Sequence, residues 1–231
     1  MLRQLLQRIS RHLPSQCAVC HAWPSQIVCG ACVAEFAQPT QRCRTCALPV
    51  PDGVTQCGAC ITHPPPLDQA LTAVRYAYPW SDMVVDFKFH QHPGLATAFA
   101  TLLRSVPWVE PALDSADLLI PMPLSRPRLR ERGYNQALVL ARALAPGKLA
   151  PHLLLRIHDT PPQSTLPRAD RLRSVANAFA LEPLQAHRLR GKRVVLLDDV
   201  MTSGASLHAA ARVLRQAGAT HITGMVFART E

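Results

Sequence analysis

Hydrophobic residues in the last two thirds of the chain alternate between short apolar runs and longer segments with helical spacing. Apolar or alternating runs typical of β-strands span residues 71–78, 116–120, 153–156, 194–197 and 221–227. Apolar residues three and four positions apart predict helices over residues 82–89, 95–106, 134–144, 168–176 and 205–217. Buried strands that alternate with helices are typical of a parallel sheet covered on both faces. The pattern therefore predicts an α/β fold.

The beginning of the chain has a different pattern, with five apolar residues on one face of a predicted helix: Leu2, Leu5, Leu6, Ile9 and Leu13. Arginine and glutamine residues interrupt them, so the segment lacks the continuous apolar core of a signal peptide. We expect a short helix that packs on the rest of the chain, although the spacing also suits a membrane surface or a partner helix. No apolar run is long enough to span a bilayer, so we expect no membrane insertion.

All eight cysteines lie before residue 61, and all eight occur as Cys-x-x-Cys pairs: Cys17 and Cys20, Cys29 and Cys32, Cys43 and Cys46, and Cys57 and Cys60. Two thiolates at this spacing on a tight turn can reach one tetrahedral zinc ion at about 2.3 Å. Four pairs supply two complete four-thiolate sites. The simplest partition joins the first two pairs on one ion and the last two on another; an interleaved pairing also fits the sequence. Redox-active pairs are the alternative interpretation.

Both zinc ions would be structural, because every ligand is a thiolate and no coordination position stays open. Such a site contributes on the order of 10–16 kcal/mol to folding. The cysteine-rich segment has few large apolar side chains and could hardly fold without it. Persistently reduced thiols also indicate a reducing compartment, so we expect the protein in the cytoplasm.

Three successive prolines, Pro64 to Pro66, follow the last cysteine pair. They can continue neither a helix nor a central strand, and they favour a stiff, extended connector. The sequence therefore predicts a domain of residues 1–66, with the N-terminal helix and the zinc ribbons, and an α/β domain of residues 67–231.

The formal net charge is +10, and it is concentrated in one stretch of the chain. Residues 121–193 contain 14 Lys and Arg residues against 4 Asp and Glu residues. A basic stretch of this density favours polyanionic partners, either phosphorylated small molecules or nucleic acid. A solvated basic surface is the alternative.

The apolar run Val194 to Leu197 is followed by Asp198 and Asp199 and then by a loop of small residues that opens a helix. A buried parallel strand carries its C-terminal end to the crevice where open α/β sheets bind ligands. Backbone N–H groups and hydroxyls of residues 202–206 would then surround an anion at the helix N-terminus, where phosphate is favoured. Carboxylates beside a phosphate are expected if they accept hydrogen bonds from ribose hydroxyls. The segment therefore predicts a ribose 5-phosphate site.

The segment from Val194 to Ser206 resembles the phosphoribosyl pyrophosphate motif of type I phosphoribosyltransferases. The wider chain is similar to the ComF family, which is associated with DNA uptake in natural competence. The likeness is carried by the cysteine-rich segment, Phe87 to Phe89, Ile120 to Leu124, Arg132 to Gln136, Gln163 to Asn177 and the motif itself. It implies a parallel-sheet type I phosphoribosyltransferase fold preceded by a small zinc-ribbon domain.

The resemblance also implies roles for individual residues. Asp198 and Asp199 would be the catalytic pair that holds the ribose hydroxyls, and the 5-phosphate would be bound by Thr202, Ser203, Gly204, Ala205 and Ser206. Pyrophosphate would lie on the turn after the strand at 116–120, formed by Pro121, Met122, Pro123, Leu124 and Ser125. An unusual peptide geometry is expected there, which Pro121 or Pro123 could supply. Arginines of the mobile loop that follows would stabilise the pyrophosphate leaving group or contact a nucleic-acid backbone: Arg126, Arg128, Arg130 and Arg132.

Two functions follow from this interpretation. The first is a phosphoribosyltransferase that expels pyrophosphate with the help of Mg²⁺, which would be held mainly by substrate oxygens. The second is a non-catalytic DNA-binding or regulatory protein that retains the phosphoribosyl site. Both bind phosphoribosyl pyrophosphate, and the resemblance implies a role in DNA uptake, with single-stranded DNA and other DNA-uptake proteins as partners.

Overall fold

A computed structural model describes residues 16–23, 25–158 and 177–231. The chain forms two compact units, Met1–Gln38 and Pro39–Glu231, and each is described by itself. The predicted N-terminal helix and the predicted helix over residues 168–176 lie outside the described residues. In the smaller unit, α2 (Gly30–Phe36) has Cys29 as its N-cap, and the sulfur of Cys29 accepts a hydrogen bond from the amide of Cys32.

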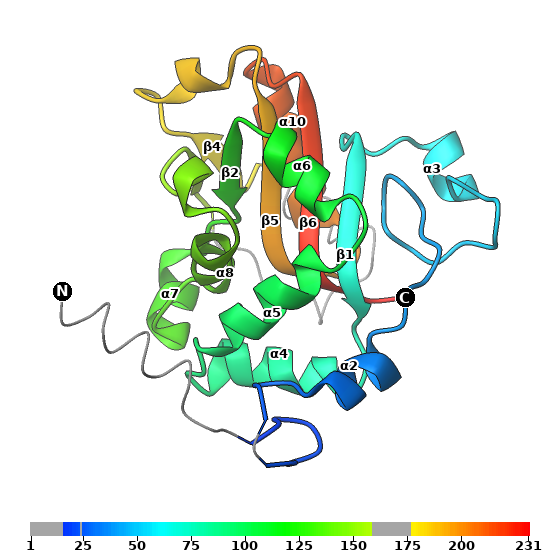
Figure 1. Cartoon of the computed structure of the whole chain (residues 1–231). Coiled ribbons are helices and arrows are strands. Elements are labelled where there is room, and N and C mark those ends of the chain that lie inside the picture. The colour runs from blue at the N-terminus through cyan, green and yellow to red at the C-terminus, as the bar shows by residue number, and fades with distance from the viewer. Residues whose placement is uncertain (1–15, 24, 159–176) are drawn as a thin grey trace. The chain divides into compact units, whose positions relative to one another are not determined.

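The larger unit is built around a four-stranded parallel sheet with the order β1-β6-β5-β2 (Figure 1). Its strands are β1 (Gln69–Arg75), β2 (Leu118–Pro121), β5 (Arg193–Met201) and β6 (His221–Arg229). Its α-helices are α3 (Gly58–Thr62), α4 (Trp80–Phe89), α5 (Leu95–Arg104), α6 (Val109–Ser115), α7 (Arg126–Arg132), α8 (Gln136–Leu144) and α10 (Ala205–Gln216). Short 3-10 turns lie at η1 (Pro146–Lys148) and η3 (Ala186–Leu189). The predicted parallel sheet and α/β fold are confirmed.

The two central strands, β5 and β6, are buried on both faces, as expected when helices cover both sides of a parallel sheet. Helix α10 packs on one face, and α5 and α6 lie on the other (Figure 1). On the α5 side, Phe227 of β6 stacks on Phe99, with ring centroids 3.7 Å apart, and meets the edge of Trp80. Aromatic contacts of this kind stabilise the core beyond simple burial.

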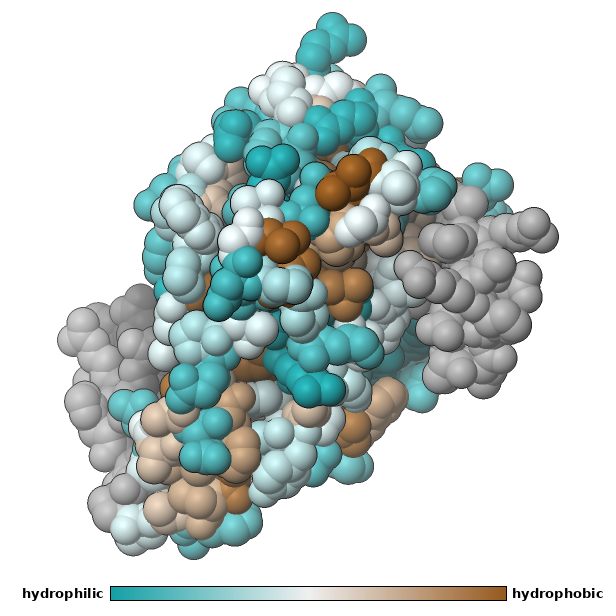
Figure 2. All heavy atoms as spheres, turned by 90° about the vertical axis from the view of Figure 1, so that its right-hand side faces the viewer, coloured by the Kyte–Doolittle hydropathy of each residue, from teal (hydrophilic) through white to brown (hydrophobic). Residues whose placement is uncertain are grey.

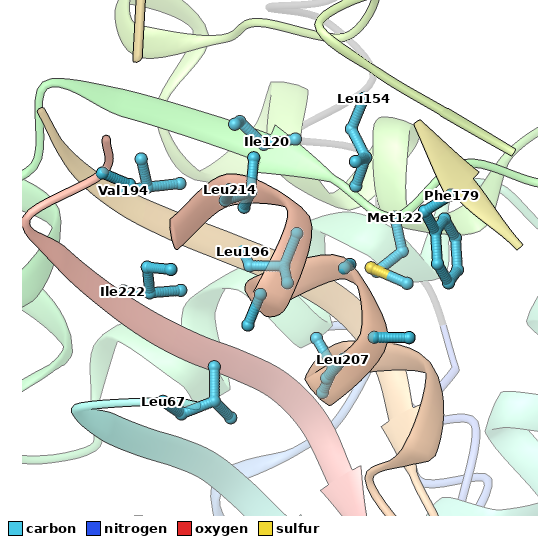
Figure 3. Close-up of a cluster of buried hydrophobic side chains, with 14 of the residues drawn as sticks. Leu67, Ile120, Met122, Leu154, Phe179, Val194, Leu196, Leu207, Leu214 and Ile222 are labelled. Atoms are coloured by element: carbon cyan, nitrogen blue, oxygen red, sulfur yellow. The ribbon is translucent and has the colours of Figure 1, made fainter. Parts of the chain in front are cut away.

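On the other face, aliphatic side chains of α10 fill the space above the sheet (Figure 3). Leu207 and Leu214 of α10 pack with Leu196 of β5 and Ile222 of β6. A small antiparallel sheet adds to the same core, formed by β3 (Leu154–Arg156) and β4 (Phe179–Leu181). The sequence predicted β3 but not β4. Phe179 is buried in this core.

The second group of cysteines, residues 43 to 60, belongs to the larger unit and packs directly on the sheet. Ala47 is fully buried in the main core, and the amide of Ala70 in β1 donates to the carbonyl of Arg44 over 2.7 Å. The compact units therefore divide after Gln38, whereas the predicted domain boundary lies after Pro66 and stays a prediction. The side that carries α3 shows hydrophobic residues in small patches among hydrophilic ones (Figure 2). Scattered apolar residues of this kind are usual on protein surfaces.

Candidate functional site

Asp198 and Asp199 lie near the C-terminal end of β5, at the edge of the sheet where parallel strands end. Asp199 is 5% exposed and Asp198 is partly buried. The amide of Asp199 donates to Oδ1 of Asp198 over 2.9 Å. The predicted pair of carboxylates therefore stands at the ligand-binding edge of an open α/β sheet.

Lys88 is not among the predicted site residues, yet it brings a positive charge to the carboxylates. Its Nζ lies 2.8 Å from Oδ1 of Asp199, and both side chains are largely buried. Burial and then the charge of Asp199 raise the pKa of Asp198 to about 7, while Lys88 and Arg132 lower it. Two carboxylates in a low-dielectric site are thus balanced by one close ammonium group, and Asp198 can change protonation near neutral pH.

The turn of residues 202–206 joins β5 to α10, and its shape depends on Gly204. Gly204 has φ +80°, and a Cβ atom there would lie 2.6 Å from Cε of Met201 and 2.9 Å from the ring of His208. Only glycine fits this backbone without strain. In the described part of the chain, the amides of Ser203 and Gly204 donate to no protein acceptor. The turn therefore presents backbone N–H groups that can donate hydrogen bonds to an anion, at the start of a 12-residue helix.

The predicted pyrophosphate turn, Pro121 to Ser125, follows β2 and is held in place from two sides. The amide of Met122 donates to Leu197 of β5 over 2.8 Å, and Nδ2 of Asn135 donates to the carbonyl of Met122 over 3.0 Å. Among the described residues, Tyr78–Pro79 is the cis peptide bond, so the unusual peptide expected at Pro121 or Pro123 is not a cis bond. Instead, the hydrogen bond from the amide of Met122 to Leu197 continues the pairing of β2 with β5 by one residue beyond the end of β2.

The four arginines that follow form helix α7, so the prediction of a mobile loop is wrong. Ser125 is the N-cap, Pro127 lies in the first turn, and Gly133 ends the helix in a left-handed conformation. A proline near the start and a glycine just past the end favour a helix. On a helix the arginines form two rows, Arg126 with Arg130 and Arg128 with Arg132.

The structure places the four arginines differently with respect to the carboxylates. Arg126 and Arg130 are exposed. Arg132 is partly buried, lies over the ring of Phe89 at 5.1 Å and donates to Oε1 of Gln136 over 3.1 Å. Its charge also lowers the pKa of Asp198. Arg132 therefore belongs to the carboxylate site, and the first row faces solvent.

Three buried side-chain atoms of the described residues have no hydrogen-bond partner: Oγ of Ser125, Nε of Arg132 and Nε2 of His208. Ser125 closes the turn after β2, Arg132 ends α7, and His208 touches Gly204. All three thus lie on elements that carry the predicted ligand site. Buried polar groups are normally paired, so this grouping indicates polar groups that a ligand can satisfy. His208 is not among the residues predicted from the sequence.

The cysteines form the two sequential clusters of the simplest partition: Cys17, Cys20, Cys29 and Cys32 in one, and Cys43, Cys46, Cys57 and Cys60 in the other. Sulfur atoms lie 3.8 Å apart between Cys17 and Cys32, 3.6 Å between Cys20 and Cys29, and 3.7 Å between Cys46 and Cys57. A tetrahedral zinc ion at about 2.3 Å from each sulfur would set them about 3.8 Å apart. A disulfide would require about 2.05 Å. Both clusters could therefore hold zinc.

Backbone amides also favour the thiolate form of one cysteine in each cluster. Sγ of Cys17 accepts from the amide of Cys29, and Sγ of Cys43 accepts from the amide of Cys57, each over 3.3 Å. Burial raises the pKa of both thiols, but these and neighbouring amides outweigh it and lower each pKa to about 6. Thiolates at neutral pH are the form that binds metal. In the described part of the chain, no helix combines the length and apolar composition that a membrane crossing requires.

Comparison with known proteins identifies the larger unit. The family model of the phosphoribosyl transferase domain matches residues 158–230. The chain is 30% identical over 210 residues to the DNA utilization protein YhgH of Salmonella typhimurium, covering 88% of this chain and 90% of that protein. Competence protein F of Haemophilus influenzae is 30% identical over 188 residues, covering 78% and 81%. Competence protein ComFC of Bacillus subtilis is 32% identical over 148 residues, covering 62% and 58%.

The match to the YhgH protein covers most of the chain, and the domain model covers β5, the turn and α10. The fold and the arrangement at the end of β5 agree with both. The chain belongs to the ComF family of phosphoribosyltransferase-like proteins, with two four-cysteine clusters before its phosphoribosyltransferase domain.

Proposed function

We propose that the chain binds the ribose 5-phosphate group of phosphoribosyl pyrophosphate at the turn of residues 202–206. The observation that carries the proposal is the turn itself, in which the amides of Ser203 and Gly204 have no acceptor among the described residues and follow the carboxylate pair within a few positions. Amide donors at a helix N-terminus suit a phosphate. The adjacent carboxylates, Asp198 and Asp199, suit the ribose hydroxyls, which need acceptors.

The other predicted residues then receive complementary roles. Ser125 and the turn of residues 121–125 bind the pyrophosphate group, together with Arg132, which adds a positive charge on the same side of the sheet. Mg²⁺ would be held mainly by oxygens of the phosphoribosyl pyrophosphate, because such hard ions keep few protein ligands in phosphate sites. Lys88 keeps the carboxylate pair partly neutralised before the ligand arrives.

Titration calorimetry with ribose 5-phosphate, and then with phosphoribosyl pyrophosphate and Mg²⁺, tests the proposal. We expect binding of both, and a loss of at least about tenfold in affinity for Asp198→Ala, since each lost hydrogen bond to a charged group is worth about 1.5–3 kcal/mol. Asp117→Ala is the matched control, because Asp117 immediately precedes β2, on the same domain but at the opposite end of the sheet. No heat from either sugar phosphate, or equal affinities for the two variants, would contradict the proposal.

The reaction class is a separate question. In a transferase, the acceptor would form a bond to C1 of the ribose while the bond from C1 to the pyrophosphate oxygen breaks and pyrophosphate leaves. We propose that Arg132 stabilises that leaving group. We expect pyrophosphate release in the presence of an acceptor base or nucleic acid. Binding without release under every acceptor tested would instead support the non-catalytic DNA-binding or regulatory function.

We further propose that the protein acts in DNA uptake in the cytoplasm and contacts single-stranded DNA, where the exposed arginines of α7 meet the phosphate backbone. The names of its relatives, which refer to competence and DNA utilization, support the process, and the exposure of Arg126 and Arg130 supports the contact. The reduced cysteine clusters suit a cytoplasmic protein. Other DNA-uptake proteins are expected partners.

The salt dependence of DNA binding tests the contact. For single strands, each phosphate contact contributes about 0.7 to the slope of log affinity against log salt. Replacing Arg126 and Arg130 by alanine should lower the slope by about 1.4, and replacing Arg128 and Arg132 as well should lower it by up to about 2.8. Arg212→Ala, on α10, provides a control arginine. A slope unchanged by all four substitutions would remove α7 from the DNA-binding surface.

A further inference from the structure

Arg229 is a buried cation at the C-terminal end of β6, and it joins three segments of the larger unit. The residue is 5% exposed. Its Nε donates to the carbonyl of Cys46 over 2.9 Å. Its Nη1 donates to the carbonyls of Met201, over 3.1 Å, and of Thr202 and Thr230. One guanidinium group therefore holds a cysteine of the second cluster on one side and the beginning of the 202–206 turn on the other.

The contact with Met201 and Thr202 determines where the turn aims its amides. In a planar trans peptide, the C=O and N–H groups point in opposite directions. Because the carbonyls of Met201 and Thr202 point to Arg229, the N–H groups of Thr202 and Ser203 point away from it. Arg229 thus orients donors at the start of the turn without forming part of the surface that a ligand would meet.

The turn that carries the Cys46 carbonyl is itself held by contacts with the rest of the larger unit. Cys46 lies in the tight turn of residues 43–47, whose Arg44 carbonyl accepts from Ala70 of β1 and whose Ala47 is fully buried in the core. Arg42 donates to the carbonyl of Ala47 over 2.9 Å. The same turn carries Cys43 and Cys46, two of the four cysteines of the second cluster, so a metal ion bound there would add a further constraint on the Cys46 carbonyl.

We propose that Arg229 is a positioning residue that couples the second cysteine cluster to the turn of residues 202–206. A zinc ion in the cluster and a sugar phosphate in the turn then stabilise each other through the guanidinium group. The identity of the anion rests on the proposed function, whereas the coupling of cluster to turn rests on the contacts of Arg229 alone. Coupling of this kind is reciprocal, so each ligand strengthens the binding of the other by the same factor.

Cysteine alkylation followed by mass spectrometry tests the coupling on the full, zinc-loaded protein. Trypsin releases residues 12–42 with all cysteines of the first cluster, and residues 45–75 with three cysteines of the second. We expect saturating ribose 5-phosphate to slow alkylation of peptide 45–75 by about fivefold or more, the lower end of common coupling energies. Alkylation of peptide 12–42 should not change. Protection of both peptides, or of neither while the sugar phosphate binds, would overturn the proposal.

Two substitutions assign the effect to Arg229. Arg229→Lys keeps the charge, but a single ammonium group cannot span from Cys46 to Thr202, so the protection of peptide 45–75 should disappear. Arg75→Gln is the matched control, because Arg75 pairs with Glu231 over 2.9 Å beside the same C-terminal segment. It should retain the protection, measured on peptide 45–88, because the substitution removes the tryptic site at residue 75 and the next site follows Lys88. Full protection in Arg229→Lys would contradict the assigned role.

A measurement without any ligand separates this inference from the proposed function. Cys57→Ser and Cys29→Ser remove equivalent residues, since each cysteine is the N-cap of the short helix in its cluster. We expect Cys57→Ser to speed amide hydrogen exchange at residues 202–206, with α4 unchanged as a measure of folding, and Cys29→Ser to have no effect there. Equal exchange in the two variants would overturn the coupling. If calorimetry detects no sugar phosphate but Cys57→Ser alone loosens the turn, the proposed function fails and the coupling stands. If Cys57→Ser unfolds the protein, protection of peptide 45–75 in the unsubstituted chain decides.

Discussion

Replacing Lys88 by methionine removes the cation beside the carboxylate pair and keeps a side chain of similar length. The ion pair with Asp199 spans 2.8 Å, with side-chain exposures of 17% for Lys88 and 7% for Asp199. At an effective dielectric constant of about 20, the gross attraction across this distance is about 6 kcal/mol. Breaking a buried pair by removing one partner costs about 3–5 kcal/mol net. Because Lys88 keeps some contact with water, we expect a cost near the lower end, about 3 kcal/mol at pH 8.

The cost should depend on pH in a definite direction. Asp198 has a folded-state pKa of about 7, above its unfolded value, so its protonated form stabilises the fold at low pH and that contribution is lost as pH rises. Lys88 lowers this pKa, so Lys88→Met should raise it further and extend the loss to higher pH. Below about pH 6, Asp198 is protonated in both proteins and the repulsion between the two carboxylates is absent. The stability deficit of Lys88→Met should therefore shrink on going from pH 8 to pH 5.5.

Urea unfolding at both pH values measures the deficit, with two further variants for comparison. Lys192→Met breaks an exposed pair with Asp117, at 3.2 Å, and should cost less than about 1 kcal/mol at either pH. The double variant Lys88→Met with Asp199→Asn should recover much of the stability, because no unpaired charge then stays buried. If Lys88→Met costs no more than Lys192→Met, or if its deficit does not change with pH, the electrostatic account of the site is wrong.

Four further results are expected. Gly204→Ala should weaken sugar phosphate binding, because its Cβ would lie 2.6 Å from Cε of Met201 and 2.9 Å from the ring of His208 and both side chains would have to shift; Gly191→Ala, also at positive φ but with no atom within 4 Å, should bind normally in calorimetry. Affinity for ribose 5-phosphate should rise with pH through about 7, as Asp198 becomes an acceptor; a flat profile would argue against its contact with the sugar. Burial, Arg212 and Arg229 lower the pKa of His208 to about 4, so its contribution to stability should be lost as pH falls from 6.5, by up to about 1.4 kcal/mol per pH unit, and His208→Gln should lack this loss in urea unfolding. Elemental analysis should find about two zinc ions per chain, and a folded metal-free protein would exclude structural sites.

The strand and turn that form the centre of the site are predictable from local sequence. The run Val194 to Leu197 is apolar at every position because both faces of β5 are buried, and two carboxylates and a glycine-containing turn follow at once. Such features lie within a dozen neighbouring residues, so their spacing is readable without knowing the fold. The order of the strands is not, since β1 lies beside β6 and β2 beside β5 through long connections that no local pattern records.

The helical spacing of α4 is enough to indicate that Lys88 is buried. Trp80, Val84 and Lys88 are each four residues apart and share one face of α4, and Trp80 and Val84 are at most 1% exposed. A lysine that continues a buried row is unusual, and it indicates a buried anion nearby. That anion is Asp199, which lies 111 residues further along the chain, so only the folded structure identifies it as the partner of Lys88. Helix α7 was missed for the opposite reason: it buries no residue, so it has no apolar periodicity to recognise.

The contacts of Arg229 show that the segment before Pro66 and the α/β domain are less separate than the sequence predicts. Three prolines favour a boundary after Pro66, but a domain boundary also requires that few contacts cross it. Arg44, Cys46 and Ala47 all cross it, through β1, the guanidinium group of Arg229 and the main core. A charged residue at the end of the buried run of β6 is the one trace of this in the sequence, since a buried cation must find acceptors somewhere. Those acceptors belong to a turn of the second cysteine cluster and to the proposed phosphate-binding turn, so the second cluster contacts the segment that shapes the candidate site and is not only a separate folding unit before it.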